Sequence, residues 1–269
     1  DIHLNPEETL SKRQLNINLR NDPDIEILKN KRAGVFDIHK IGEVFSYNPL
    51  LFKQKVMKTY VKPFEVVFLL DYSGSMSRIS IFLQKQITKI LCKYFEENNV
   101  DISIYAHTSF TKDYLGHWVQ ADKIKGDDSH DSCALYEIRS PDETRHYPFF
   151  SNEDEGIYQR ENYDGHALEA LHKILQQRNR SKSIMYISIS DGSPEGVGYG
   201  GKGAFLYLKK AVEKLKREGF PTIGFLIDYC HEAELYDYNL KLSTKNIDIN
   251  FHNVSRLINK VIKENFIIN

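Results

Sequence analysis

Two short apolar runs, each leading into an aspartate, dominate the pattern of hydrophobic and polar positions. The first reads VVFLL over residues 66–70 and leads into Asp71; the second reads IMYISI over residues 184–189 and leads into Ser190 and Asp191. Continuous apolar runs of this length, rich in β-branched residues, are typical of parallel strands buried on both faces. The pattern therefore predicts two central strands, each with a carboxylate at its carboxyl end.

Strand-like and helix-like patterns alternate from Lys62 onward. The expected helices are Ile79–Phe95, Ala167–Gln177, Ala204–Lys216 and Val254–Glu264, and the further expected strands are Val100–His107, Cys133–Arg139, Pro221–Asp228 and Ile247–Phe251. Helices that alternate with buried strands are the signature of βαβ units. We therefore expect an α/β fold with a doubly wound, mostly parallel sheet flanked by helices, as in Rossmann-like domains.

The first 60 residues differ from the rest of the chain. Asn16–Asp24 is polar and rich in turn formers, and Ala33–Phe52 carries scattered apolar residues that suit a short helix. We therefore divide the chain into an N-terminal arm with short helices, residues 1–60, which packs on a domain formed by residues 61–269. Because the first residue is Asp1 rather than Met, the chain is consistent with a fragment or a processed form.

Polar oxygen ligands follow the first predicted strand at alternate positions. Asp71, Ser73 and Ser75 lie where that strand turns toward the next helix, and Asp191 lies at the same end of the second strand. Open α/β sheets bind ligands at the carboxyl ends of their strands. One carboxylate and two hydroxyls suit a hard divalent cation, with Mg²⁺ first and Mn²⁺ or Ca²⁺ as alternatives. The competing interpretation of Asp71 and Asp191 is helix N-capping.

The D-x-S-x-S order of Asp71, Ser73 and Ser75 resembles the metal-ion-dependent adhesion site of von Willebrand factor A (vWA) domains. In such domains a D-G pair, here Asp191-Gly192, supplies the distal acidic residue, and the resemblance also implies the fold expected above. The third element is normally a threonine before an apolar helix. Asn162 falls at that position and Asp164 two residues later, so the resemblance leaves the third ligand open between them.

The departure from threonine is itself informative. The stretch E-N-x-D-G-x-A-L over residues 161–168, followed by S-D-G-x-P over 190–194, resembles the C-terminal vWA domain of the T subunit of aerobic cobaltochelatase. The likeness covers roughly residues 34–269, with the specific motifs confined to three short blocks. It implies a protein that works beside an AAA+ ATPase of the MoxR-like, cobaltochelatase S-like class.

In a site of this kind, an Asp or Glu of a protein client can complete the coordination of the cation. The residues around the ligands are then expected to contact the partner: Tyr72, Met76, His166, Gly192 and Ser193. A metal bridge to an acidic residue makes binding depend on both the metal and the client. If no such bridge exists, the interface is expected on the irregular segment Thr108–Arg160 or on the glycine-rich loop Gly196–Gly203.

Three functions remain open at this point. The chain is a vWA partner of an ATPase in a cobaltochelatase-like complex, a true chelatase subunit that takes part in inserting cobalt into a corrin ring, or a stand-alone adhesion or scaffold module. Catalysis by the chain itself is not expected. Ser73 lacks the G-x-S-x-G context of a hydrolase nucleophile, and the glycine-rich loop lacks the G-K-[ST] ending of a phosphate loop.

Composition limits the expected cellular location of the protein and the expected classes of partner. The net charge is −1, so general attraction to nucleic acid or to an anionic membrane is not expected. The sequence has no apolar run of membrane-spanning length and no signal-peptide pattern. Three widely spaced cysteines (Cys92, Cys133 and Cys230) form neither a C-x-x-C zinc motif nor a disulfide framework. We therefore expect a cytoplasmic protein rather than an extracellular adhesive one.

Overall fold

The computed structural model describes residues 25–32, 35–37, 39–40, 50, 52–57, 60–110, 132–141, 161–178, 183–196, 198–229, 234–245 and 247–268. Much of the irregular segment Thr108–Arg160, and Cys230, lie outside these residues. A six-stranded sheet forms the centre of the molecule, with the strand order β10-β9-β8-β5-β6-β7. Its strands are β5 (Phe64–Asp71), β6 (Asp101–Phe110), β7 (Ser132–Arg139), β8 (Ser183–Ser190), β9 (Thr222–Ile227) and β10 (Tyr238–Leu242).

The sheet is mostly parallel. All neighbouring strands run parallel except β7, which pairs antiparallel with β6 at one edge. The two strands predicted from their apolar runs, β5 and β8, lie side by side at the centre, and every residue of β5 is buried. In the register between β5 and β6, Asp71 pairs with His107. The carboxyl ends of β5, β6 and β8 therefore meet at one edge of the sheet.

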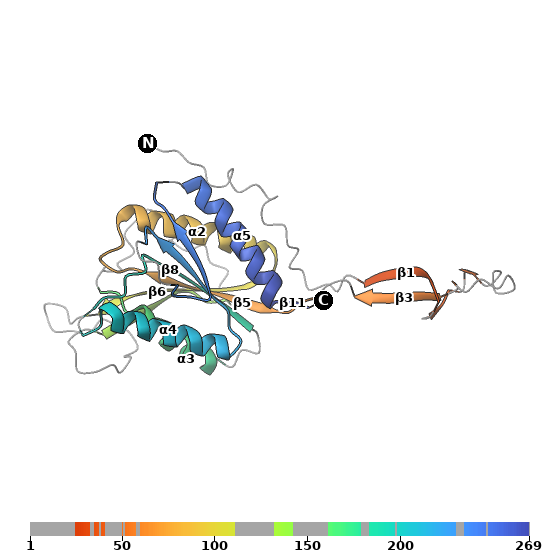
Figure 1. Ribbon diagram of the computed structural model, residues 1–269, viewed down its shortest axis with the longest axis horizontal. Coiled ribbons are helices and arrows are strands. Elements are labelled where there is room, and N and C mark those ends of the chain that lie inside the picture. Colours follow the sequence, from red (N-terminus) through yellow and green to blue (C-terminus); the bar gives the residue numbers. More distant parts are fainter. Residues whose placement is uncertain are drawn as a thin grey trace.

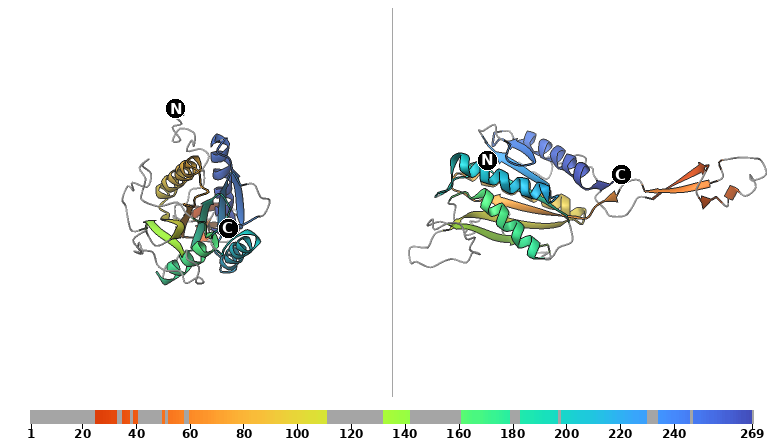
Figure 2. Two further views of the ribbon diagram at one scale, coloured as in Figure 1. Left: turned by 90° about the vertical axis from the view of Figure 1, so that its left-hand side faces the viewer. Right: turned by 60° about the horizontal axis from the view of Figure 1, so that its bottom comes forward.

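Four helices cover the two faces of this sheet: α2 (Arg78–Glu97), α3 (Asp164–Gln177), α4 (Gly201–Arg217) and α5 (Ile247–Asn265). Figures 1 and 2 show α2 and α5 on one face and α3 and α4 on the other. Each helix is amphipathic and buries its apolar stripe against the strands. One hydrophobic cluster lies under α2 and α5, and a second lies under α3 and α4. The predicted doubly wound α/β architecture is confirmed.

One predicted strand is wrong. Residues 247–251 form the first turns of α5, and the sixth strand is β10, Tyr238–Leu242. Phe251, Val254 and Ile258 recur at helical spacing and are all buried in the cluster beneath α2 and α5. The strand β10 was missed because it lies at the sheet edge, where most of its residues are only partly buried. A half-buried edge strand carries a weak periodic signal.

The N-terminal arm contains strands where it is described. Strands β1 (Ile25–Lys31), β3 (Phe52–Met57) and β2 (Val35–Phe36) form a small antiparallel sheet. Figures 1 and 2 show this sheet beyond one end of the layered domain. Most of the segment in which a short helix was expected, residues 41–49, lies outside the described residues. The pair β4 (Tyr60–Val61) and β11 (Ile267–Ile268) joins the two ends of the layered domain.

Candidate metal site

The turn after β5 arranges the three residues of the D-x-S-x-S motif. The carboxylate of Asp71 is fully buried, and its Oδ1 accepts a 2.7 Å hydrogen bond from the backbone N–H of Ser73. The hydroxyls of Ser73 and Ser75 lie 2.9 Å apart. Ser73 is buried, whereas Ser75 is exposed to solvent. The motif therefore runs from a buried carboxylate to a hydroxyl on the surface.

The second oxygen of Asp71 is held by two side chains that are distant in sequence. Its Oδ2 accepts hydrogen bonds from Asn162 Nδ2, at 2.8 Å, and from Ser190 Oγ, at 2.9 Å. The Ser190 hydroxyl also lies 3.2 Å from Asp164 Oδ2 and accepts the backbone N–H of Gly192. Ser190 thus ties the end of β8 to both carboxylates.

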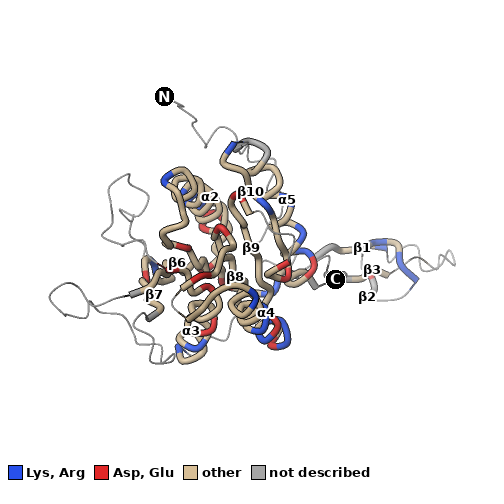
Figure 3. Tube along the Cα trace, turned by 60° about the vertical axis from the view of Figure 1, so that its left-hand side comes forward, with Lys and Arg blue, Asp and Glu red and all other residues tan. Residues whose placement is uncertain are grey.

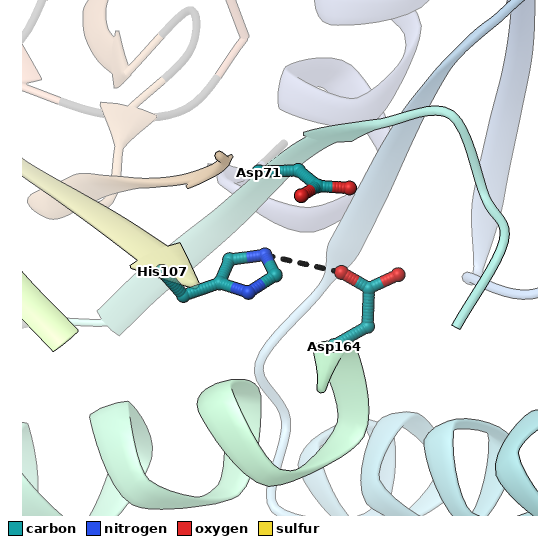
Figure 4. A group of neighbouring side chains, drawn as sticks. All are labelled: Asp71, His107 and Asp164. Carbon is teal, nitrogen blue, oxygen red and sulfur yellow. Dashed lines mark ion pairs between the residues drawn. The ribbon is translucent and has the colours of Figure 1, made fainter. Parts of the chain in front are cut away.

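The start of α3 brings Asp164 into the same cluster. Asn162 Oδ1 accepts the backbone N–H of Asp164 at 2.9 Å, and the Asn162 backbone forms a two-way bridge with Glu195. The other oxygen of Asp164, Oδ1, lies 3.1 Å from Nε2 of His107, a residue in the second half of β6. Figure 4 shows the side chains of Asp71, His107 and Asp164 around a common space, with the His107 ring directed toward Asp164. All three side chains are buried.

Asp191 completes the acidic edge of the site. Its Oδ1 accepts the backbone N–H of Ser193 at 2.9 Å, and it also interacts with the hydroxyl of Ser75. Gly192 follows with a φ of 71°, a conformation that favours glycine. A Cβ at this position would lie 2.6 Å from the Tyr229 ring, so the turn after Asp191 leaves room only for glycine. Figure 3 shows acidic positions among the strands between α2 and α3.

The electrostatics of the site reflect buried negative charge. Burial raises the pKa of Asp71, and the nearby carboxylates of Asp164 and Asp191 raise it further, against the lowering effect of His107. Burial also raises the pKa of Asp191, opposed by its hydrogen bonds from Ser75 and Ser193. Burial lowers the pKa of His107, but the interaction with Asp164 and the charges of Asp71 and Asp191 outweigh it, so that the net shift is upward.

The site is suited to a divalent cation. Asp71, His107 and Asp164 each offer one ligand atom, and these atoms lie within 4.8 Å of one another. Asp164 Oδ1 is buried without a hydrogen-bond donor among the described residues, apart from its ion pair with His107. Carboxylates that share a buried site repel one another, and a hard cation would neutralise them. With Ser73, Ser75 and Asp191, the cluster supplies mainly oxygen donors.

The structure brings all six predicted ligand residues into one cluster: Asp71, Ser73, Ser75, Asn162, Asp164 and Asp191. Within it, Asn162 donates its amide N–H to Asp71 and so positions that carboxylate. Among the described residues, Asp164 Oδ1 contacts only His107, whereas Asn162 Oδ1 already accepts the backbone N–H of Asp164. This difference favours Asp164 over Asn162 as the third ligand. Sequence reasoning missed His107 and Ser190 as members of the site. The available signal was that His107 ends the predicted strand Val100–His107 and that Ser190 ends β8.

The residues predicted to contact a partner differ in exposure. Ser193 and His166 are partly exposed, whereas Gly192 is buried. Tyr72 and Met76 are buried in the hydrophobic cluster beneath α2 and α5, and their contact with a partner stays a prediction.

The fold and the acidic cluster at the strand ends together define a vWA-type domain with a candidate metal site. The sequence model described as "Cobalamin biosynthesis protein CobT VWA domain" matches residues 51–218, more than half of the chain. The chain therefore belongs to the CobT VWA domain family. No match to a curated protein sequence was found. No helix among the described residues is long and apolar enough to cross a bilayer.

Solved structures with similar folds share little sequence with this chain. The pilus adhesin SpaC from Lactobacillus rhamnosus GG, in its open conformation, is 15% identical, with a TM-score of 0.46 over 77% of this chain and 31% of the adhesin. The manganese-loaded TRAP protein of Plasmodium vivax is 12% identical, with a TM-score of 0.42 over 76% of both chains. BatB from Bacteroides thetaiotaomicron, a conserved hypothetical protein, is 16% identical, with a TM-score of 0.40 over 74% of this chain and 97% of BatB. The chain thus spans about a third of the length of the SpaC adhesin.

Proposed function

We propose that this chain is a metal-dependent protein-binding domain and the non-ATPase partner of an AAA+ ATPase of the MoxR-like class, in a cobaltochelatase-like complex. The observation that carries the proposal is the graded burial of the site. Asp71, Ser73 and Asp164 are buried, while the Ser75 hydroxyl, which lies beside Ser73 and interacts with Asp191, is exposed. A cation held here is reached from solvent on the Ser75 side.

The role of each residue follows from its contacts. Asp71, Asp164 and Asp191 supply the negative charge that attracts the cation, and Ser73 and Ser75 supply neutral oxygens. Asn162 and Ser190 hold Asp71 in place through hydrogen bonds to its Oδ2. A bound divalent cation supplies a Lewis-acidic coordination position that an Asp or Glu of a client or of the ATPase can fill. Mg²⁺ is the proposed ion, and the proposed location is the cytoplasm.

A second candidate function is direct participation in cobalt insertion into a corrin ring. The family description, which names cobalamin biosynthesis, favours it. The two candidate functions predict complexes of different subunit composition. Co-purification of an AAA+ ATPase together with a corrin-ring-binding subunit supports the chelatase subunit, whereas an ATPase without that subunit supports an adaptor in another system.

Metal binding is tested by calorimetry with Mg²⁺ and Mn²⁺. Asp71→Ala should weaken binding by more than about 100-fold, because it removes the central carboxylate that three donors orient. Glu213→Ala, at an exposed carboxylate on α4, is the matched control and should bind like the wild type. Circular dichroism should show that both variants fold, since apolar strands build the sheet. Equal affinity of Asp71→Ala and the wild type would rule out the site.

Partner binding is tested with Ser75→Ala and with EDTA in a pull-down of the ATPase. Both should weaken the association, and Ser75→Ala should do so with a nearly unchanged thermal midpoint, because the exposed hydroxyl contributes little to the fold. The free energy lost then belongs to binding rather than to folding. A pull-down indifferent to both treatments would exclude a metal bridge.

A further inference from the structure

The outer face of α2 combines exposed apolar side chains with basic ones. Ile79 and Phe82 are 59% and 44% exposed, and among the large apolar residues described in the layered domain only Leu206 on α4 is comparably exposed. The opposite side of α2, with Leu83, Ile87 and Leu91, is fully buried. The exposure is therefore confined to one stripe of an otherwise well-packed amphipathic helix.

Basic residues share this stripe. At 100° per residue, Lys85, Lys89 and Lys93 fall within about 60° of Phe82, and Arg78 lies beside it one turn earlier. We call these positions the α2 surface: Arg78, Ile79, Phe82, Lys85, Lys89 and Lys93. The acidic residues of α2 are confined to its last two positions, Glu96 and Glu97, and Glu96 forms an ion pair with Arg139.

The charges of α2 run against its own dipole. The first turn of the helix contains no acidic residue and begins with Arg78, and the last turn contains no basic residue. Helices are stabilised by the reverse arrangement, with acidic residues at the start and basic residues at the end. The position of Arg78 is therefore not explained by helix stability. Arg78 places positive charge at the helix end that adjoins the metal site, and Lys85, Lys89 and Lys93 continue it along the helix away from that end.

The α2 surface is continuous with the metal site. Ser77 caps α2 by accepting the backbone N–H of Ser80, and the exposed Ser75 lies only two residues before this cap. Inside the domain, Gln84 Nε2 donates to the backbone oxygen of Asp71 at 3.2 Å, which fixes the helix to the end of β5. Figure 3 shows α2 on the outside of the domain. A partner that reaches Ser75 meets Ile79 and Phe82 next.

We propose that the α2 surface docks an acidic amphipathic helix of the partner protein. Its apolar side chains pack on Ile79 and Phe82, and its carboxylates face Arg78 and the three lysines. An apolar stripe flanked by one sign of charge is the surface that a helix of opposite charge fits. The further step, in which one of its carboxylates reaches the cation beside Ser75, rests on the proposed function.

The test uses the full chain and a synthetic helical peptide. In this peptide, leucines are spaced alternately three and four residues apart, and glutamates occupy positions between them. Its binding is followed by fluorescence anisotropy with Mg²⁺ present. Phe82→Ser and the double variant Lys85→Glu/Lys89→Glu should each weaken binding about tenfold. The matched controls on α4, Leu206→Ser and Lys209→Glu/Lys210→Glu, make the same kinds of change at exposed residues and should bind within about twofold of the wild type.

Several results would overturn the inference. These are no binding of the peptide up to about 1 mM, equal losses in the α2 and α4 variants, and equal binding of a peptide in which every glutamate is glutamine. Two others assign the surface to a different occupant: α2-dependent binding to vesicles with about 30% phosphatidylserine that is tighter than peptide binding, or an α2-dependent dimer in sedimentation equilibrium.

The same assay separates this inference from the proposed function. If the α2 variants lose the peptide but EDTA and Asp71→Ala have no effect, the surface is confirmed and the metal bridge fails. If EDTA and Asp71→Ala weaken binding while the α2 variants bind like the wild type, the metal bridge stands and the α2 surface is refuted.

Discussion

At the scale of single residues, His107 is the positive counterpart of the buried carboxylates. Its ring lies 3.1 Å from Asp164 Oδ1 and pairs in register with Asp71. Its raised pKa favours the imidazolium, which neutralises part of the negative charge of the site when no cation is bound. A divalent cation in the cluster would neutralise the same carboxylates. His107 and the cation therefore stabilise the folded site in the same way, by neutralising the buried carboxylates.

We expect His107→Ala to lower the free energy of unfolding by about 3 kcal/mol in EDTA, because it leaves a buried carboxylate without its partner. In saturating Mg²⁺ the loss should be clearly smaller, since the cation takes over the neutralisation. Urea denaturation with and without Mg²⁺ measures both values.

The matched control is His172→Ala. His172 is also buried and contacts Glu218 and Tyr186, about two turns along α3 from Asp164. Its loss should be the same in EDTA and in Mg²⁺. Equal losses for His107→Ala in the two conditions would place the cation away from Asp164, and a larger loss in Mg²⁺ would make His107 a ligand.

At the scale of elements, the turn that ends β8 sets the position of Asp191. Gly192 has a φ of 71° and lies against Tyr229, whereas Gly219, after α4, has a φ of 84° with open space around its Cβ position. The two glycines share a backbone conformation and differ in packing. Alanine substitutions at the two positions therefore distinguish the cost of backbone strain from the cost of a steric clash.

Gly219→Ala should cost about 1 kcal/mol of stability, which is the strain of the left-handed conformation alone. Gly192→Ala should cost about 3 kcal/mol, because strain and the clash with Tyr229 add. It should also weaken Mg²⁺ binding, since a displaced turn moves Asp191. Chemical denaturation and calorimetry measure the two effects. Equal stability losses in both variants would show that the turn tolerates a side chain.

At the scale of the whole molecule, the layered domain is built without the arm. Within the described residues, both hydrophobic clusters begin at Val61 or later, and β4 pairs with β11 next to the end of the chain. The backbone N–H of Lys62 also donates to Phe266 at 2.7 Å. The segment around residues 60–62 is therefore part of the domain, and the strands before it are not needed for its core.

A shortened chain that begins at Tyr60 should keep its Tm within about 3 °C of the full chain. A chain that begins at Pro63 loses β4 and the contact to Phe266, and its Tm should fall by about 5 °C or more. Thermal unfolding of the two shortened chains, followed by circular dichroism, tests both expectations and the predicted domain boundary after residue 60. A large loss in the first shortened chain would show that the arm supports the domain.

The fold was largely predictable because its central strands are buried on both faces. Such strands appear in the sequence as continuous apolar runs, and the helices that cover them show regular apolar spacing. Within the layered domain, the exceptions are the edge strand β10 and the start of α5. In both, a short mixed segment satisfies strand and helix patterns equally well, and packing against Phe251 and its neighbours decides between them.

For the site, the sequence by itself determined the local motif of Asp71, Ser73 and Ser75 and the acidic end of β8, because these residues lie within a few positions of a recognisable strand. Only the tertiary structure decided the rest. Strand register places His107 beside Asp71, and Ser190 reaches Asp71 across 119 positions of the chain. Hydrogen bonds between distant segments depend on register and helix packing, which leave no periodic trace in the sequence.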